Sequence, residues 1–319
     1  MAAAENSNDR STAEILLSIL EKHDDTAVLE LLTPLHPVEI AEILEEIDPE
    51  HWSKILSLLP HELNAEVIAE LETHWAHIVA KMLPAERVAD IIGEMETDDA
   101  TDFLQSVSEK DRQEILHQID KKDVAEFGVL LGYPEDSAGG IMQTELVSVT
   151  PDKTVADAIA AIRKKSEDLV KIPVVYVVDK ENKLLGLVEI QDLIIHSPTK
   201  SINEILQPIK QKITPFMDQE VVALVFKRFN IMALPIVDEQ ERLLGQVLVD
   251  DIVDVLEAEA SEDMLMMAGA EGHELVYSDR YFSIAMSRMV WLFATLAGSL
   301  ITGYLMWFFK GVIENTIAL

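Results

Sequence analysis

Two stretches of this chain repeat one another, and this internal repeat limits the fold more than any other feature of the sequence. Residues 146–194 and 210–256 each contain an apolar run that ends in Val-Asp, then a Leu-Gly pair, then an Asp that opens a helical segment. Apolar β-branched runs are typical of buried strands, and the Gly suits a close return of the chain. The repeat predicts two copies of one α/β unit. The matched positions are Val178 with Val237, Asp179 with Asp238, Leu185 with Leu244, Gly186 with Gly245, and Asp192 with Asp251.

A shorter repeat occupies the first part of the chain. Between residues 16 and 123, units of about 12 residues open on Pro, Thr or Ser, continue with acidic residues and end in an apolar run. These opening residues suit the start of a helix, where acids also interact favourably with the helix dipole. Short helices of this kind bury their apolar faces by stacking on one another. We predict an all-α superhelical domain over residues 16–132, after a disordered N-terminus at residues 1–15.

A long segment without charge lies near the other end of the chain. Residues 289–309, MVWLFATLAGSLITGYLMWFF, contain no Asp, Glu, Lys or Arg, and aromatic residues stand near both ends of the run. About 20 apolar residues are enough for a helix to cross a bilayer, and aromatic residues are common at its interfaces. We predict a transmembrane helix here, followed by a short end at residues 310–319. Because a single span cannot form a pore, we expect the natural chain to continue past Leu319.

The charge balance narrows the class of partner. The formal net charge is −33 at pH 7, and the chain contains no Cys. Nucleic-acid binding depends on Lys and Arg that neutralise phosphates, so we expect no nucleic-acid partner. Thiolate zinc sites, disulfides and Cys nucleophiles are excluded, and we find no nucleophile–base pair or P-loop, so we expect no enzyme. A chain this acidic favours cationic partners, either metal ions or a basic protein surface.

Acidic residues concentrate in the segment 248–263, LVDDIVDVLEAEASED, which is expected to be helical. Like charges three or four residues apart cost a helix about 0.2–0.5 kcal/mol per pair, and no Lys or Arg in the segment offsets them. Either the acidic face is simply hydrated, or a cation from elsewhere neutralises it. Mg²⁺ prefers hard oxygen ligands and often takes only one or two carboxylates, so it suits such scattered acids. No D-x-D-x-D-G run supports an EF-hand.

A second acidic group follows Thr97 in the helical domain. Thr97 is expected to cap a helix whose first turn contains Asp98 and Asp99, and capping accounts for most of this pattern. Asp102 lies one turn beyond Asp98. Both side chains are therefore able to face one ligand.

The repeated α/β unit resembles a tandem CBS pair, also called a Bateman module. We place the module at residues 133–258, with CBS1 at 139–197 and CBS2 at 202–258. In that family the cleft between the repeats often binds adenine nucleotides, which implies ATP as a ligand and Tyr176 and Asp192 as nucleotide-binding candidates. Asp192 fits equally well as the N-cap of the helix that follows it. Its neighbours Glu189 and Gln191 offer no cation for phosphates.

The order of these segments, together with several motifs, resembles the MgtE magnesium channel family. The motifs are AEVI at 65–68, DDATD at 98–102, PEDSAGGIM at 134–142, DQE at 218–220 and the acidic segment at 248–263. The implied fold class is multidomain: an all-α superhelical N domain, an α/β tandem CBS module, a connecting helix and one transmembrane helix. Family members are homodimers with five membrane helices per subunit. The resemblance therefore implies a homodimer in a bacterial-type inner membrane, with residues 1–288 in the cytoplasm.

In this family the N domain and the CBS pair bind several Mg²⁺ ions at acidic interfaces. By resemblance, Gly140 and Lys227 each contribute a backbone carbonyl, and Asn230 stands where the family has Asp, so a charge is lost there. The candidate Mg²⁺ ligands are Glu66, Asp98, Asp102, Gly140, Asp218, Glu220, Lys227, Asn230, Asp251, Asp254, Glu259, Glu262 and Asp263.

The resemblance also implies a mechanism of gating. Residues 259–288 form a connector and plug helix, of which the amphipathic part is 275–288. When Mg²⁺ is plentiful, bound ions bridge the N domain, the CBS pair and the acidic helix, and hold the plug against the pore; when Mg²⁺ falls, the carboxylates repel one another. The alternative is a membrane-anchored CBS protein that senses a nucleotide and regulates a partner. Nucleotide binding that Mg²⁺ does not affect, in a chain naturally complete at Leu319, favours this alternative.

Overall fold

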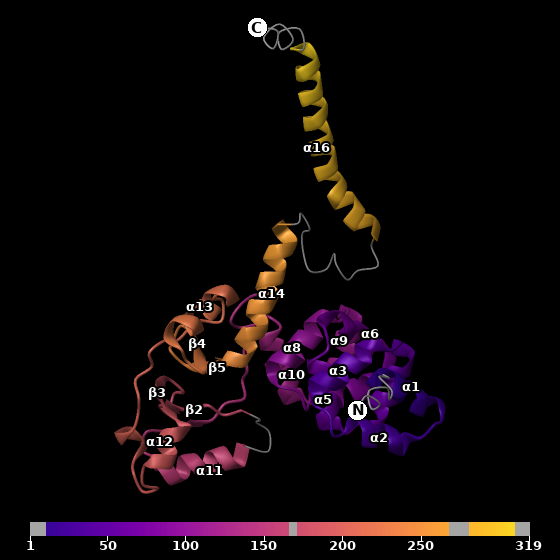
Figure 1. Cartoon of the computed structure of the whole chain (residues 1–319). Coiled ribbons are helices and arrows are strands. Elements are labelled where there is room, and N and C mark those ends of the chain that lie inside the picture. Colours follow the sequence, from indigo (N-terminus) through magenta and orange to yellow (C-terminus); the bar gives the residue numbers. More distant parts are fainter. Residues whose placement is uncertain (1–10, 166–170, 268–280, 310–319) are drawn as a thin grey trace, which may run out of the picture. The chain divides into compact units, whose positions relative to one another are not determined.

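The structure is a computed structural model that describes residues 11–165, 171–267 and 281–309 (Figure 1). The chain divides into two units, residues 1–252 and residues 253–319, and each is described by itself. Residues 1–10 of the predicted disordered N-terminus lie outside the described residues. The first helix begins at Thr12, inside the segment that we predicted to be disordered. Ser11 caps it, because its Oγ accepts a hydrogen bond from the backbone N–H of Ala13 at 3.3 Å.

Short helices make up the first part of unit 1, drawn from indigo to magenta in Figure 1. Several of them begin at or next to the Ser or Pro that the repeat predicts, namely Pro37, Pro60, Pro84 and Ser108, whereas α2 begins after Asp24. The helices are α1 (Thr12–Glu21), α2 (Asp25–Leu32), α3 (Pro37–Glu46), α4 (Trp52–Leu58), α5 (His61–Ala69), α6 (Ala76–Met82), α7 (Ala85–Ile92), α8 (Thr97–Ser106), α9 (Glu109–Leu116) and α10 (Lys121–Leu130), with 3₁₀ turns at Pro49–His51 and Thr73–Trp75.

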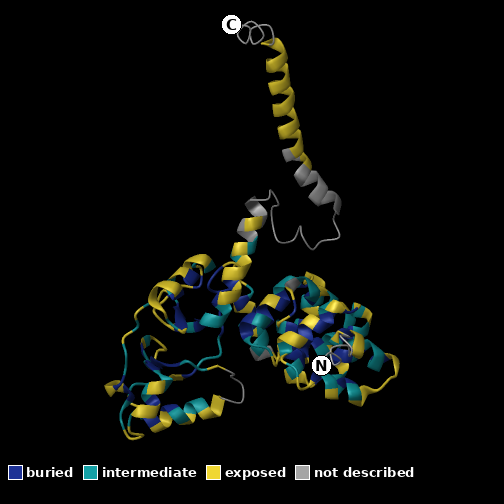
Figure 2. Cartoon of the chain, in the orientation of Figure 1, coloured by how far each residue is buried: buried dark blue, intermediate teal, exposed yellow. Residues whose placement is uncertain are grey.

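Each of these helices is too short to be stable alone, so it depends on burying one face against its neighbours. α7 shows the pattern, because Val88, Ala89, Ile91 and Ile92 are buried while Asp90 is exposed. Figure 2 shows buried and exposed residues interspersed throughout the helical part of the chain. Alternate helices pack on one another: α1 on α3, α3 on α5, α5 on α7, and α7 on α9. The prediction of an all-α domain in this part of the chain is confirmed.

The rest of unit 1 contains the two repeated α/β units. In the first, β1 (Ser148–Val149) pairs in parallel with β2 (Val174–Val178), which pairs antiparallel with β3 (Leu184–Glu189). In the second, β4 (Ala233–Val237) pairs antiparallel with β5 (Leu243–Leu248), and a parallel bridge between Ile213 and Ile236 stands in the place of the β1–β2 pair. The predicted duplication is confirmed. The helices are α11 (Val155–Lys165), α12 (Ile190–Ile195) and α13 (Gln219–Phe229), with a 3₁₀ turn at Ile202–Glu204.

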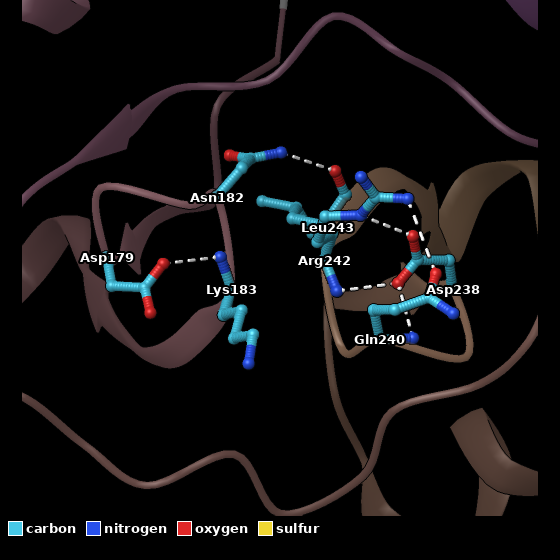
Figure 3. A network of polar contacts seen from close by, with 7 residues as sticks. All are labelled: Asp179, Asn182, Lys183, Asp238, Gln240, Arg242 and Leu243. Carbon is cyan, nitrogen blue, oxygen red and sulfur yellow. Dashed lines mark hydrogen bonds and ion pairs between the residues drawn. The ribbon is translucent and has the colours of Figure 1, made fainter.

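The two hairpin turns of the repeats match atom for atom and bind one another (Figure 3). Asp179 Oδ1 accepts a hydrogen bond from the N–H of Lys183 at 2.8 Å, and Asp238 Oδ1 accepts one from the N–H of Arg242 at the same distance. Asn182 then donates from its side chain to the carbonyl of Leu243 at 2.8 Å. This contact joins the turn of the first repeat to that of the second, and each Asp after the central strand closes its own turn by accepting backbone hydrogen bonds.

Each repeat has a Gly where another segment crosses it. A Cβ at Gly186 would lie 2.4 Å from the carbonyl oxygen of Gln207, and a Cβ at Gly245 would lie 2.6 Å from that of Gln143. The second crossing places the segment that follows the helical domain against the second repeat, because Gln143 and Gln246 exchange two backbone hydrogen bonds of 2.9 Å. The chain therefore leaves the helical domain and meets CBS2 before it builds CBS1.

Two longer helices complete the described chain. The acidic segment forms α14 (Val249–Met267), which begins in unit 1 and runs into unit 2, as predicted for a helix over residues 248–263. The second is α16 (Tyr281–Phe308), a 28-residue helix that contains the end of the predicted plug and nearly all of the predicted span without a break. Residues 268–280 of the connector lie outside the described residues. Among the helices of residues 11–165, 171–267 and 281–309, none meets the combined length and hydropathy expected of a membrane span.

Candidate metal site at the first turns of α8 and α14

The first turn of α8 binds the segment that leads from the helical domain into CBS2. Thr97 Oγ1 donates a hydrogen bond to Glu145 Oε2 at 2.7 Å and accepts one from the backbone N–H of Thr144 at 2.9 Å. The interpretation of Thr97 as the N-cap is wrong, because the helix begins at Thr97 and Glu96 holds the N-cap position. The hydroxyl of Thr97 is instead used to hold α8 against the α/β module.

Beside this contact, the buried side-chain amide of Gln143 donates hydrogen bonds to two carboxylates. Gln143 Nε2 donates to Glu96 Oε2 at 2.9 Å and to Asp98 Oδ2 at 3.1 Å, and only 3% of the Gln143 surface is exposed. The other oxygen of Asp98, Oδ1, is buried and has no hydrogen-bond partner in the described part of the chain. A buried carboxylate oxygen without a donor costs free energy, so this atom marks a place where a donor or a cation fits.

Three carboxylates crowd together at this point. Oxygens of Glu96, Asp98 and Asp99 all lie within 4.8 Å of one another. Burial, and after it the charge of Glu96, raises the pKa of Asp98 to about 7 despite the hydrogen bond from Gln143. Burial and the charges of Asp98 and Glu96 raise the pKa of Asp99 to about 9. Without a counter-ion, these groups therefore favour their protonated forms near neutral pH.

The first turn of α14 adds acid to the same group. Asp251 is half-buried, and its Oδ2 accepts a hydrogen bond from the backbone N–H of Leu248 at 3.0 Å, which fixes the start of the helix. Burial, and then the charge of Asp98, raises the pKa of Asp251 to about 8. The neighbouring Asp250 forms an ion pair with Lys171. We call Glu96, Asp98, Asp99, Asp102, Asp250 and Asp251 the interface carboxylates.

Three predicted ligands thus come together: Asp98, Asp102 and Asp251. Asp102 lies on α8 one turn after Asp98 and is exposed, so solvent reaches its carboxylate even though the surrounding protein and Asp98 raise its pKa to about 7. The prediction missed Glu96, Asp99 and Asp250 as members of the group. The adjacent acids at 96, 98 and 99 were a visible signal, but capping explained them, and only the fold brings α14 to the same place.

Gly140 lies in a tight turn that follows the helical domain. A Cβ on Gly140 would lie 2.5 Å from the carbonyl oxygen of Glu135, so the turn accepts no larger residue without moving. Its neighbours Ala138 and Gly139 donate backbone hydrogen bonds to Met217 and Pro215 at 2.6 and 2.8 Å. The turn is therefore fixed against the segment just before α13.

The predicted ligands around α13 have structural partners. Asp218 is the N-cap of α13, and its Oδ1 accepts a hydrogen bond from the N–H of Glu220 at 2.9 Å. Lys227 is exposed in the last turn. Asn230 ends the helix with a φ of 50°, a left-handed conformation that Asn adopts more readily than most residues. Helix termination therefore supplies a reason for Asn at this position.

The remaining candidates are dispersed. Glu66 is exposed on α5 and is not one of the three carboxylates grouped on α8. Asp254 is exposed and Glu259 half-buried on the part of α14 that belongs to unit 2. The side chains of Glu262 and Asp263 lie outside the described residues.

A cavity of about 370 Å³ lies between the two CBS repeats. Glu189, Gln191, Gln207 and Lys210 supply most of its polar wall, and Pro173 and Pro235 line it from the two central strands. Lys210 is a cation that the sequence around Asp192 did not predict. The size suits a small organic molecule.

The two nucleotide-binding candidates differ in their positions. Asp192 lies beside the cavity and accepts a hydrogen bond from Gln207 Nε2 at 2.6 Å. The alternative interpretation of Asp192 as an N-cap is wrong, because Glu189 holds that position in α12. Tyr176 is fully buried in the core beside Val174 and Val178, and its hydroxyl has no partner in the described part of the chain. Burial raises the pKa of this phenol.

Comparison with known proteins agrees with this arrangement. Residues 35–136 match the model of the MgtE intracellular N domain, and residues 138–198 and 204–258 match the CBS domain model. The magnesium transporter MgtE of Thermus thermophilus is 35% identical over 315 residues, which cover 98% of this chain and 70% of that protein. The chain belongs to the MgtE family of magnesium transporters. MgtE of Bacillus subtilis is 29% identical, and the match covers 70% of this chain and 49% of that protein.

Solved structures support the same fold for the MgtE chain. The crystal structure of the soluble part of a magnesium transporter matches with a TM-score of 0.73 at 29% identity, covering 78% of this chain and 98% of that one. The cytosolic domain of the Mg²⁺ channel MgtE in complex with ATP matches with a TM-score of 0.72 at 34% identity, covering 76% and 99%. MgtE proteins are transporters rather than enzymes, and CBS domains are regulatory modules.

Proposed function

We propose that this chain is the Mg²⁺-sensing region of a magnesium channel or transporter, and that the interface carboxylates are its principal sensor. The observation that carries the proposal is the group Glu96, Asp98 and Asp99, whose oxygens lie within 4.8 Å of one another. The charges of Asp98 and Glu96 also raise the pKa of Asp251 on α14. A hard divalent cation offsets the repulsion of several carboxylates at once, and Mg²⁺ accepts oxygen ligands together with water. Resemblance adds Asp102, Gly140, Glu66 and the acids of α13 and α14 as further ligands.

The sensing step follows from differential affinity. Ions that bind the carboxylates of α8 and α14 together favour the state in which these two helices are close, because a single helix provides only part of the ligand set. At low Mg²⁺ these carboxylates either stay ionised and repel one another or must take up protons, so the close state loses the free energy that the ion supplies. The connector and plug, residues 259–288, would pass this change to a pore formed by membrane helices, of which residues 289–309 are one.

The membrane part of the proposal is supported by the sequence. Residues 289–309 carry no charged side chain, and α16 extends over nearly all of them. We therefore place the chain in a bacterial-type inner membrane as a homodimer, with residues 1–288 in the cytoplasm. Proteoliposome uptake of Mg²⁺ by the complete natural chain tests transport, and crosslinking in membranes tests the dimer.

Titration calorimetry of the 319-residue chain in detergent tests Mg²⁺ sensing. We expect uptake of Mg²⁺ by the parent chain and a large loss of heat when Asp98→Asn and Asp99→Asn are combined. The matched control is Asp90→Asn, an exposed Asp on α7 outside the interface carboxylates, which is expected to leave the titration unchanged. A parent chain that takes up no Mg²⁺ would contradict the proposal.

A second function is favoured by the cavity between the CBS repeats. We propose that it binds an adenine nucleotide such as ATP, as in the complex of the related cytosolic domain. Asp192 is placed to hold ribose hydroxyls if Gln207 releases it, and Lys210 is placed to meet a phosphate. Calorimetric titration with ATP tests this. Asp192→Asn and Lys210→Gln are each expected to weaken binding, and Lys200→Gln serves as a control outside the cavity wall.

A further inference from the structure

Lys171 brings a positive charge into the interface carboxylates from CBS1. It stands just before β2, and its ammonium forms an ion pair with Asp250 of α14, 79 residues further along the chain. The pair joins the start of the central strand of the first repeat to the helix that ends the second repeat. Lys171 is about half exposed and Asp250 is less so, with side-chain exposures of 56% and 38%.

The field of Lys171 reaches beyond Asp250. The ion pair with Asp250, opposed by partial burial, raises the pKa of Lys171, and the charges of Glu96 and Asp251 act in the same direction. Burial raises the pKa of Glu96, and the charge of Lys171 acts in the opposite direction and limits this rise. The ammonium of Lys171 thus interacts with Glu96 at the N-cap of α8 and with the acids in the first turn of α14.

The other side of the group has no such compensation. Asp98 is only 7% exposed, and its Oδ1 has no hydrogen-bond partner in the described part of the chain. Its strongest partner is a neutral amide, Gln143, and the nearest charges that act on it are negative. The interface carboxylates therefore have two sides. Lys171 binds Asp250 on one side, and the structure describes no cation bound to Asp98 on the other.

We propose that Lys171 is a tethered cation that occupies one of the positions that a divalent ion would otherwise take among the interface carboxylates. This inference rests on the proposed Mg²⁺ sensing and deepens it. Lys171 neutralises the Asp250 side at every Mg²⁺ concentration, so the concentration-dependent step falls on Glu96, Asp98 and Asp99. The residue thereby sets the affinity of the sensor, because its charge opposes the arrival of a further cation nearby.

The direction and size of the effect follow from Coulomb's law. A unit charge and a divalent ion about 7 Å apart in a water-like medium interact strongly enough to change a dissociation constant about three- to tenfold. Removal of the ammonium is therefore expected to tighten Mg²⁺ binding by about that factor. Removal of the ammonium is also expected to lower the melting temperature of the Mg²⁺-free protein, because Asp250 then has no ion-pair partner in Lys171.

The test uses the 319-residue chain in detergent with three variants. Lys171→Gln removes the charge, Lys171→Arg keeps it, and Lys212→Gln is a matched control that breaks an exposed ion pair with Glu241 elsewhere in the module. Each protein is melted without Mg²⁺ and with saturating Mg²⁺, and each is titrated with MgCl₂ by calorimetry.

We expect Lys171→Gln to melt earlier than the parent without Mg²⁺, to regain the parent melting temperature with Mg²⁺, and to bind Mg²⁺ about three- to tenfold more tightly. Lys171→Arg should behave as the parent does, and Lys212→Gln should show no Mg²⁺-dependent difference. Equal melting and equal affinity of Lys171→Gln and Lys212→Gln would overturn the inference. If the parent binds no Mg²⁺, the proposed function fails, whereas the Mg²⁺-free melting of Lys171→Gln still reports separately whether the ammonium neutralises the group.

Discussion

Replacement of Asp98 by Asn tests the physical basis of the candidate site most directly. Asp98 has an ordinary pKa of 3.8, which burial and Glu96 raise to about 7 in the folded chain. The folded protein therefore holds the proton more tightly than the unfolded chain does. The contribution of Asp98 to stability is therefore most favourable below pH 3.8. It falls as the pH rises through the two pKa values, and the full cost of the ionised group is present above about pH 7.

The size of this cost follows from the two pKa values. A difference of one pKa unit corresponds to about 1.4 kcal/mol, so the ionised carboxylate costs the Mg²⁺-free protein up to about 4 kcal/mol at pH 8. Asn keeps an oxygen that can accept the hydrogen bond from Gln143, and its NH₂ group can donate towards neighbouring acids. Asp98→Asn is therefore expected to stabilise the Mg²⁺-free protein at pH 8 while it removes a ligand.

Thermal melting at pH 8 in the presence of EDTA, and again with saturating MgCl₂, measures both effects. A gain of a few kcal/mol corresponds to a rise of several degrees in a chain of this size. We expect Asp98→Asn to melt higher than the parent without Mg²⁺ and to gain less from added Mg²⁺, while Asp90→Asn matches the parent in both conditions. An Asp98→Asn protein that melts lower than the parent in EDTA would refute the reasoning, since it would mean that the charge itself stabilises the fold.

Three further outcomes test other parts of the structure. The melting temperature of the Mg²⁺-free parent should fall as the pH rises from about 4 to 9, because the pKa values of Asp98, Asp251 and Asp99 are raised to about 7, 8 and 9, and saturating Mg²⁺ should flatten this slope, as melting across buffers would show. Gly186→Ala should destabilise the fold by about 1–3 kcal/mol in denaturant unfolding, because its Cβ would lie 2.4 Å from a backbone oxygen; an unchanged midpoint would contradict the close contact. Tyr176→Phe should be neutral or stabilising by up to about 1 kcal/mol in the same assay, because the buried hydroxyl has no partner among the described residues, and a loss of stability would point to a bound partner for it.

The repeats in the sequence predicted the fold because each repeat is stabilised by contacts between residues that are close in the sequence. Asp179 and Asp238 close equivalent turns on their own backbone, so their spacing in the sequence is already the spacing of the structure. The short helices were predictable for the same reason, since Pro60, Pro84 and Ser108 each stand at the N-terminal end of the helix that directly follows. Local hydrogen bonds of this kind depend little on the rest of the chain.

The candidate site was only partly predictable because its members meet through non-local packing. Asp98 and Asp102 were recognised by their spacing of one turn on α8. Glu96 and Asp99 were not, because the sequence does not reveal that Gln143, 47 residues after Glu96, binds the first turn of α8. The place of Lys171 was also hidden, since nothing in the sequence pairs it with an acid 79 residues away.

The balance of forces at this interface determines whether an ion can control it. Four hydrogen bonds from Thr97, Thr144 and Gln143 join α8 to the α/β module, and bonds of this kind contribute about 0.5–3 kcal/mol each, more when the acceptor is charged. Against them stands the cost of the ionised carboxylates, of which Asp98 alone reaches up to about 4 kcal/mol at pH 8. The hydrogen bonds therefore favour the close state, and the ionised carboxylates oppose it. A divalent ion that binds only the close state offsets the opposing term and shifts the population towards that state. These hydrogen bonds are therefore as necessary to the proposed sensing as the acids, because they hold α8 against the α/β module while the carboxylates lack a cation.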